Sequence, residues 1–236
     1  MHQFRVTSVL FDLDGTLVDS VPDLARSVDE TMQVLGLPAR GDDAVRGWVG
    51  NGVEPLIIRA LANDYLATSD TRTEHALGVF GPIYARNNGR HSQLFPAVGS
   101  TLKALHELGL RLGCVTNKPR AFTLPLLTSL GIARWFDTVV SPEDAGAKKP
   151  DPAPLLFALK QLDTEPQHAI YVGDSVHDIE AANRAGVTAI GVPYGYNHGN
   201  SIASAHPDAI IETLAELLDH PLLISPPRTS PRNPNP

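Results

Sequence analysis

The sequence of 236 residues predicts an α/β fold: a doubly wound parallel sheet with helices on both faces, and an inserted small α-helical domain. Short, continuously apolar runs alternate with longer amphipathic ones, which is typical of parallel strands that helices cover on both sides. One long stretch, about 22–88, breaks this alternation and contains only helical patterns. The length allows one or two domains and a large core, so folding needs no disulfide or structural zinc.

The elements of the sheet follow in chain order. The apolar runs predict six strands, at residues 9–11, 111–116, 138–140, 169–172, 188–192 and 209–211. Amphipathic runs beside them predict five helices, at residues 101–108, 122–130, 153–162, 179–185 and 214–218. Gly109, Gly131 and Gly186 each follow one of these helices, at the position where a left-handed residue commonly ends a helix.

The stretch between the first two strands forms the predicted insertion. Its helical patterns cover residues 24–35, 44–48, 55–62 and 73–84. We therefore divide the chain into a core of residues 1–18 and 92–224 and an inserted helical domain of residues 19–91. Residues 225–236 are predicted to form a disordered tail, because the last eleven residues hold five prolines and no other apolar side chain.

The composition excludes several classes of protein. The formal net charge is −7, and this acidic balance argues against nucleic acid as the main partner. Cys114 is the single cysteine, which excludes an internal disulfide and a multi-cysteine metal site. The chain lacks both a run of ~18 apolar residues, as a membrane span requires, and a signal-peptide core near the N-terminus. We expect a cytoplasmic protein without a membrane partner, either a monomer or a homodimer.

Polar residues follow four of the predicted strands. They lie in the segments 12–16, 116–118, 148–150 and 173–178. In an open parallel sheet, ligands bind at the carboxyl ends of the strands, so we expect these residues to converge on one crevice.

The acidic residues of this crevice favour a divalent cation. Asp12 and Asp14 are two residues apart, so their side chains lie on one side if the chain stays extended. Two close carboxylates repel each other, and Asp174 and Asp178 add further negative charge. Oxygen ligands without nearby histidine or cysteine favour Mg²⁺ over zinc. Each aspartate taken alone also fits a turn or helix-capping residue, an alternative that the set at matching strand ends disfavours.

Thr116 and Lys149 supply what a phosphate group requires. A transferring phosphoryl group spreads charge over its oxygens, and a hydroxyl, backbone N–H groups and an ammonium can stabilise that charge. Pro150 stiffens the segment that carries Lys149. Lys148 is the competing candidate, and we expect one of the two lysines to be a solvated surface residue.

These motifs resemble, in their order, those of the haloacid dehalogenase-like hydrolases, along nearly the whole chain except the tail. The resemblance implies that Asp12 is a nucleophile that forms an aspartyl-phosphate. It implies that Asp14 first protonates the leaving oxygen and then activates water. Thr116 and Lys149 would hold the phosphoryl group. An acidic residue at position 14 also favours phosphoryl transfer over cleavage of a carbon–halogen bond.

The same resemblance implies the cofactor and the metal ligands. Mg²⁺ would bind the side chains of Asp12 and Asp174 and the backbone carbonyl of Asp14. Asp178 would orient a metal-bound water or Lys149.

The insertion resembles the small cap domain of phosphoglycolate phosphatases, through the segments 36–38, 46–52 and 59–61, and 194–197 outside it. This implies a small phosphorylated metabolite, 2-phosphoglycolate, as substrate. Gly50 and Asn51 would present backbone N–H groups to its carboxylate, and Asn117 would contribute to substrate binding. An ordinary turn between two helices is the alternative for this loop.

Three other functions stay open at this point. They are hydrolysis of another small phosphate such as a sugar phosphate, a phosphomutase reaction, and non-catalytic binding on the same fold. The complete set of motif residues argues against the last of these.

Overall fold

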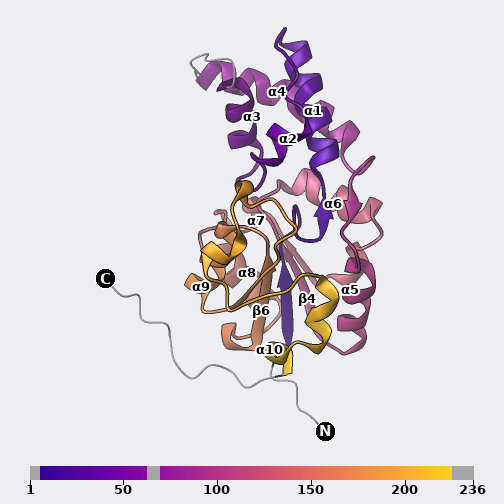
Figure 1. The fold of residues 1–236 in the computed structure, drawn as a ribbon, viewed down its shortest axis with the longest axis vertical. Helices are drawn as coiled ribbons and strands as arrows, with labels where there is room; N and C mark the ends of the chain where they lie inside the picture. The colour runs from indigo at the N-terminus through magenta and orange to yellow at the C-terminus, as the bar shows by residue number, and fades with distance from the viewer. Residues whose placement is uncertain (1–5, 63–69, 225–236) are drawn as a thin grey trace, which may run out of the picture.

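The computed structural model describes residues 6–62 and 70–224, and Figure 1 shows their arrangement. Within these residues, one sheet contains six strands, in the order β5-β4-β1-β6-β7-β8. Their bounds are Ser8–Phe11 (β1), Arg111–Val115 (β4), Thr138–Val140 (β5), Ala169–Gly173 (β6), Thr188–Gly191 (β7) and Ala209–Ile210 (β8). Each neighbouring pair is parallel, so the carboxyl ends of all six strands lie at one edge. This confirms the predicted fold class and each predicted strand.

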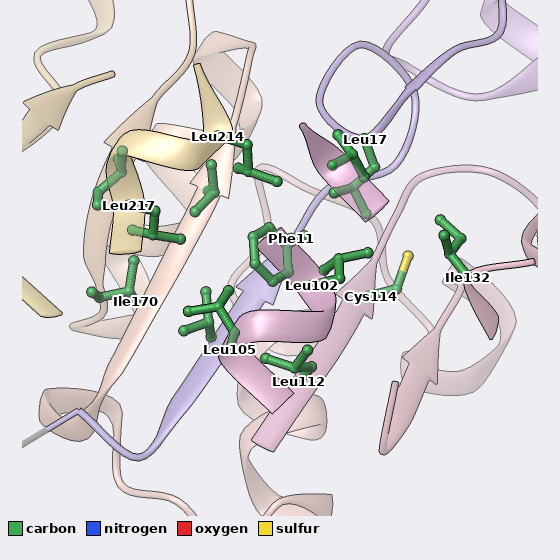
Figure 2. Close-up of a cluster of buried hydrophobic side chains, with 14 of the residues drawn as sticks. Phe11, Leu17, Leu102, Leu105, Leu112, Cys114, Ile132, Ile170, Leu214 and Leu217 are labelled. Carbon is green, nitrogen blue, oxygen red and sulfur yellow. The ribbon is translucent and has the colours of Figure 1, made fainter. Parts of the chain in front are cut away.

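Helices cover both faces of the sheet. Their bounds are Val98–Glu107 (α5), Arg120–Ser129 (α6), Pro142–Ala145 (α7), Ala153–Gln161 (α8), Val176–Ala185 (α9), Pro221–Ile224 (α10) and, for the 3-10 helix η5, Leu214–Asp219. Along β1, Val9 and Phe11 pack beneath α5, α6 and η5, while Leu10 packs beneath α8 and α9. Figure 2 shows the first of these clusters, in which Cys114 is a buried core residue.

The inserted segment forms a separate helical layer, which we call the cap. It consists of Val21–Val34 (α1), Asp42–Arg46 (α2), Val53–Ala62 (α3) and Asp70–Asn87 (α4). These helices pack around their own apolar cluster and lie beyond the carboxyl edge of the sheet (Figure 1). A short antiparallel pair, Val18–Asp19 (β2) with Gln93–Leu94 (β3), joins the two chain crossings between sheet and cap. Two-residue strands give no sequence pattern, so this pair was not predicted. The boundaries at 18/19 and 91/92 stay predictions.

Several helix ends differ from the predicted ones. Helix α9 begins three residues earlier than expected, because Ser175 caps it and Asp178 completes a capping box. The predicted helix at 214–218 is the 3-10 helix η5. Gly109, Gly131 and Gly186 have positive φ, which confirms their predicted role at helix ends. Among the described helices, none combines the length and apolar character that crossing a membrane requires. The predicted tail and residues 1–5 lie outside the described residues.

Candidate active site

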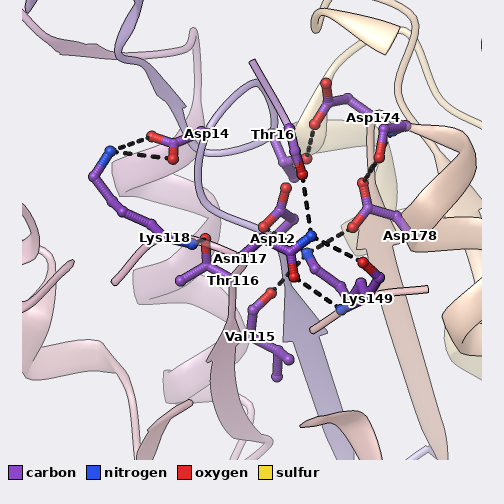
Figure 3. A network of polar contacts seen from close by, with 12 residues as sticks. Asp12, Asp14, Thr16, Val115, Thr116, Asn117, Lys118, Lys149, Asp174 and Asp178 are labelled. Atoms are coloured by element: carbon purple, nitrogen blue, oxygen red, sulfur yellow. Dashed lines mark hydrogen bonds and ion pairs between the residues drawn. The ribbon is translucent and has the colours of Figure 1, made fainter. Parts of the chain in front are cut away.

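Four segments meet at the carboxyl edge of the sheet, as the strand pattern predicted (Figure 3). Asp12 directly follows β1, Thr116 directly follows β4, and Asp174 directly follows β6. Lys149 arrives from the segment between α7 and α8. All four side chains are buried. The parallel topology therefore brings together groups that are up to about 160 residues apart in the sequence.

Lys149 is the central cation of this group. Its Nζ lies 2.7 Å from Asp12 Oδ1 and 2.7 Å from Asp178 Oδ1. It also donates to the hydroxyl of Tyr171 at 2.6 Å and to the carbonyl of Val115 at 3.0 Å. Burial alone would lower the pKa of this lysine, but the two carboxylates outweigh that effect and raise the pKa above its ordinary value. Lys149 is therefore a fixed positive charge beside Asp12.

The competing lysine is placed differently. Lys148 is exposed, and its Nζ lies 3.4 Å from the backbone carbonyl of Asn51. One of the two adjacent lysines is thus a surface residue, and Lys149 is the one within the cluster.

Three buried carboxylates lie close enough together to hold a metal cation. Oxygen atoms of Asp12, Asp174 and Asp178 lie within 4.8 Å of one another. Burial and the nearby charge of Asp178 raise the pKa of Asp174 to about 7. Burial also raises the pKa of Asp12, and Lys149 offsets this only in part. Buried carboxylates with raised pKa values indicate that the cluster lacks positive charge, which a divalent cation would supply.

The hydrogen bonds of the carboxylates separate their roles. Asp178 accepts four bonds, from Lys149 Nζ, the Tyr171 hydroxyl, and the backbone N–H and hydroxyl of Ser175. A carboxylate offers about four acceptor positions, so Asp178 is fully used. Asp174 accepts only two bonds, both at 2.8 Å, from the Thr16 hydroxyl and the Tyr196 backbone N–H. Asp12 and Asp174 thus retain lone pairs for a hard cation such as Mg²⁺, whereas Asp178 positions Lys149.

Asp14 departs from the expected geometry. Its carboxylate does not join the three-carboxylate cluster but pairs with Lys118, whose Nζ lies 3.0 and 3.1 Å from the two oxygens. The strand ends at Phe11 and the chain then turns, so the expected alternation of an extended chain does not apply. Gly15 has φ of 92°, and a Cβ there would collide with the Asp174 carboxylate, so glycine allows this turn.

Comparison with known proteins identifies the family. The model of the haloacid dehalogenase-like hydrolases matches residues 9–192. The chain belongs to the haloacid dehalogenase-like hydrolase family. This confirms the resemblance seen in the motifs, and the sheet with its inserted cap is the fold of solved relatives in that family.

Two relatives and one solved structure carry the name phosphoglycolate phosphatase. A phosphoglycolate phosphatase of Nitrosococcus oceani is 46% identical over 210 residues, which cover 89% of this chain and 93% of that protein. A second one, from Yersinia pseudotuberculosis, is 45% identical over 92% of this chain and 94% of its own length. The crystal structure of a predicted phosphoglycolate phosphatase from Haemophilus somnus has a TM-score of 0.86 and 35% identity, and covers 91% of this chain and 97% of that one.

A pocket of this hydrolase opens between the sheet edge and the cap. Asp12, Asp14 and Thr116 line it from the core, and Gly50 and Gly52 line it from the cap. Three further lining residues from the core and the cap are Asn117, Lys118 and Tyr84. The pocket is partly open to solvent.

The Gly-Asn-Gly loop contacts the core through a backbone carbonyl and through its asparagine, while the role of its backbone N–H groups stays a prediction. The carbonyl of Gly50 accepts a hydrogen bond from the Asn117 side chain at 3.1 Å. The side chain of Asn51 lies between Arg59, at 3.4 Å, and His177 Nε2, at 2.8 Å. The loop therefore offers a carbonyl oxygen to the core and engages its polar side chain elsewhere, which suits docking of the cap.

Sequence reasoning gave no role to Lys118, although it follows Thr116 and Asn117 directly. Its side chain is buried and its backbone N–H donates to the Thr116 hydroxyl at 3.1 Å. The pattern of polar residues after a strand marks all three positions, but it does not reveal that Lys118 faces Asp14.

Proposed function

We propose that this protein is a Mg²⁺-dependent phosphatase that hydrolyses 2-phosphoglycolate to glycolate and phosphate. The observation that carries the proposal is the Asp12 carboxylate, which lies 2.7 Å from Lys149 Nζ and lines the same pocket as Thr116 and Asp14. A buried carboxylate beside a fixed cation, open to a small pocket, suits nucleophilic attack on a phosphoryl group. The names of relatives at 45–46% identity support the phosphatase reaction and this substrate.

The reaction proceeds in two steps on Asp12. In the first step, an Oδ atom of Asp12 forms a bond to phosphorus while the bond from phosphorus to the glycolate oxygen breaks. Asp14 donates its proton to that leaving oxygen. In the second step, water attacks the phosphorus of the aspartyl-phosphate and gives a proton to Asp14, while the bond from phosphorus to the Asp12 Oδ atom breaks. Inorganic phosphate leaves, and both carboxyl groups return to their initial forms.

The surrounding side chains stabilise charge during both steps. Lys149 compensates the negative charge on Asp12 and on the phosphoryl oxygens, and the Thr116 hydroxyl donates to one of those oxygens. Asp178 keeps Lys149 in position, because its Oδ1 lies 2.7 Å from the ammonium. Mg²⁺, when bound by Asp12, Asp174 and the Asp14 carbonyl, would supply further positive charge to the phosphoryl oxygens.

A substrate panel tests this function. Phosphate release is measured for 2-phosphoglycolate, a sugar phosphate, pyrophosphate and p-nitrophenyl phosphate, with Mg²⁺ and with EDTA. We expect the highest kcat/KM for 2-phosphoglycolate, loss of activity in EDTA, and no turnover by Asp12→Asn. A preference for the sugar phosphate would redirect the proposal to another small phosphate. Phosphate release that Asp12→Asn leaves unchanged would refute the catalytic assignment.

A further inference from the structure

Tyr84 is a buried polar residue at the pocket that the reaction above does not use. It lies on α4 of the cap, and its ring packs against Phe80 and Phe122, with centroid distances of 5.2 and 4.7 Å. It lines the pocket with Asp12 and Asp14. Its side chain is fully buried, and within the described part of the chain its hydroxyl makes no hydrogen bond of good geometry. The polar group beside it is the Lys118 ammonium, which is itself a donor and leaves the phenol O–H without an acceptor.

A buried O–H group without an acceptor is unusual, because buried polar groups nearly always form a hydrogen bond to protein, water or ligand. Burial raises the pKa of Tyr84 to about 12, so the phenol stays protonated at neutral pH and remains a donor. The packing of its ring holds the hydroxyl in place. The position therefore fits a ligand acceptor better than a second protein group.

Lys118 lies beside this hydroxyl, on the core side of the pocket. Its Nζ is 5.0 Å from the centroid of the Tyr84 ring and contacts both oxygens of Asp14. An ammonium has three N–H donors, and Asp14 takes at most two of them. Among the described residues that line the pocket, Lys118 is the one cation, because Lys149 is not part of the lining. Much of the remaining lining is apolar, through Leu24, Val49, Val53 and Leu56.

We propose that the Tyr84 hydroxyl and the Lys118 ammonium together bind a carboxylate on the leaving group of the substrate. This inference rests on the proposed phosphatase function and names the groups that select the substrate. A carboxylate accepts from both donors, whereas an alkyl leaving group would leave the phenol O–H without an acceptor.

The test compares two substrates that differ only at the proposed contact. Ethyl phosphate has the chain length of 2-phosphoglycolate but a methyl group in place of the carboxylate. The measured quantity is the ratio of kcat/KM for 2-phosphoglycolate to that for ethyl phosphate. Tyr84→Phe deletes one oxygen and keeps the ring packing, and we expect it to lower the ratio by at least about tenfold. Lys118→Met should lower the ratio at least as much.

One control variant and one binding measurement accompany these variants. Lys103→Met removes an exposed lysine from α5 and should leave the ratio unchanged. Binding of 2-phosphoglycolate to Asp12→Asn, measured by calorimetry with and without Tyr84→Phe, tests the contact without turnover, and we expect Kd to rise about tenfold. If Lys118→Met fails to fold, the kcat/KM ratio and the Kd of Tyr84→Phe alone decide whether the subsite is correct.

The outcomes separate this inference from the function itself. If the wild-type protein prefers 2-phosphoglycolate and Tyr84→Phe keeps both that preference and the Kd, the subsite is wrong while the function stands. If the wild-type protein has the same kcat/KM for ethyl phosphate and for 2-phosphoglycolate, both the proposed substrate and the carboxylate subsite are wrong.

Discussion

Replacing Asp174 with asparagine is expected to stabilise the metal-free protein at pH 8, although it removes a proposed metal ligand. The side chain is 3% exposed and accepts from the Thr16 hydroxyl and the Tyr196 backbone N–H. Asparagine can keep both contacts: its Oδ1 accepts from Tyr196, and its amide donates to the Thr16 hydroxyl, which can also accept. The substitution therefore removes a charge while the shape and both hydrogen bonds are retained.

The size of the effect follows from the pKa of Asp174. Burial and the charge of Asp178 raise this pKa from 3.8 to about 7. Between these values the native protein holds a proton that the unfolded chain has lost, so the free energy of unfolding falls as pH rises. The loss is about 1.4 kcal/mol per pH unit and reaches roughly 4 kcal/mol above pH 7. Well below pH 3.8 both states are protonated, so the difference between wild type and Asp174→Asn should vanish as the pH falls toward that range.

Urea unfolding in EDTA between pH 4 and pH 8 measures this difference. Asp219→Asn, which removes an exposed carboxylate, serves as a control and should stay within about 0.5 kcal/mol of wild type. Added Mg²⁺ at a hundred times its Kd should then stabilise wild type by about 2.7 kcal/mol and have little effect on Asp174→Asn. A variant that is less stable than wild type at pH 8, or a difference that does not change with pH, would refute the electrostatic reasoning.

Three further predictions concern buried polar contacts. Lys149→Met should lower the free energy of unfolding by about 3–5 kcal/mol in urea titrations, because it leaves two buried carboxylates without their shared cation; a loss below about 1 kcal/mol would contradict this. Asp23→Asn should cost about 2 kcal/mol in the same assay, because Asp23 accepts from three backbone N–H groups and the Ser92 hydroxyl; wild-type stability would argue against this anchor. Asn117→Ala should raise KM for 2-phosphoglycolate about tenfold in steady-state kinetics, because it unfastens the loop at Gly50; an unchanged KM would count against cap docking.

The strands could be predicted closely from the sequence, whereas the helix starts could not. A buried parallel strand is an apolar run with polar residues at its end, so both its position and the site that follows it appear in the sequence. A helix start depends on polar capping residues, which lie before the first apolar residue of the helix and leave no mark in the apolar pattern. Ser175 caps α9 while Asp178 both completes the capping box and binds Lys149. Asp178 thus helps to start the helix and also contributes to the site.

The directions of side chains beyond the strands were the part that sequence could not supply. Asp14 was expected beside Asp12, but the turn at Gly15 directs it to Lys118. Asn51 lies in a recognisable glycine loop, yet its partner His177 is 126 residues away. Such contacts depend on how the cap packs on the core, and no local sequence pattern predicts this packing.

The contacts of Asn117 divide the site into two parts that respond differently to cap movement. Its side chain accepts from the Lys149 backbone N–H at 2.8 Å, donates to the Lys149 carbonyl at 3.0 Å, and donates to the Gly50 carbonyl at 3.1 Å. Only the last bond reaches the cap. Cap opening would therefore leave Lys149 held against the core, while it would separate Tyr84 on α4 from Lys118 on the core. The groups assigned to phosphoryl transfer would stay together if the cap opened, whereas the proposed carboxylate subsite would form only with the cap closed. Selection of the leaving group would then occur at closure, and bond cleavage would remain a property of the core.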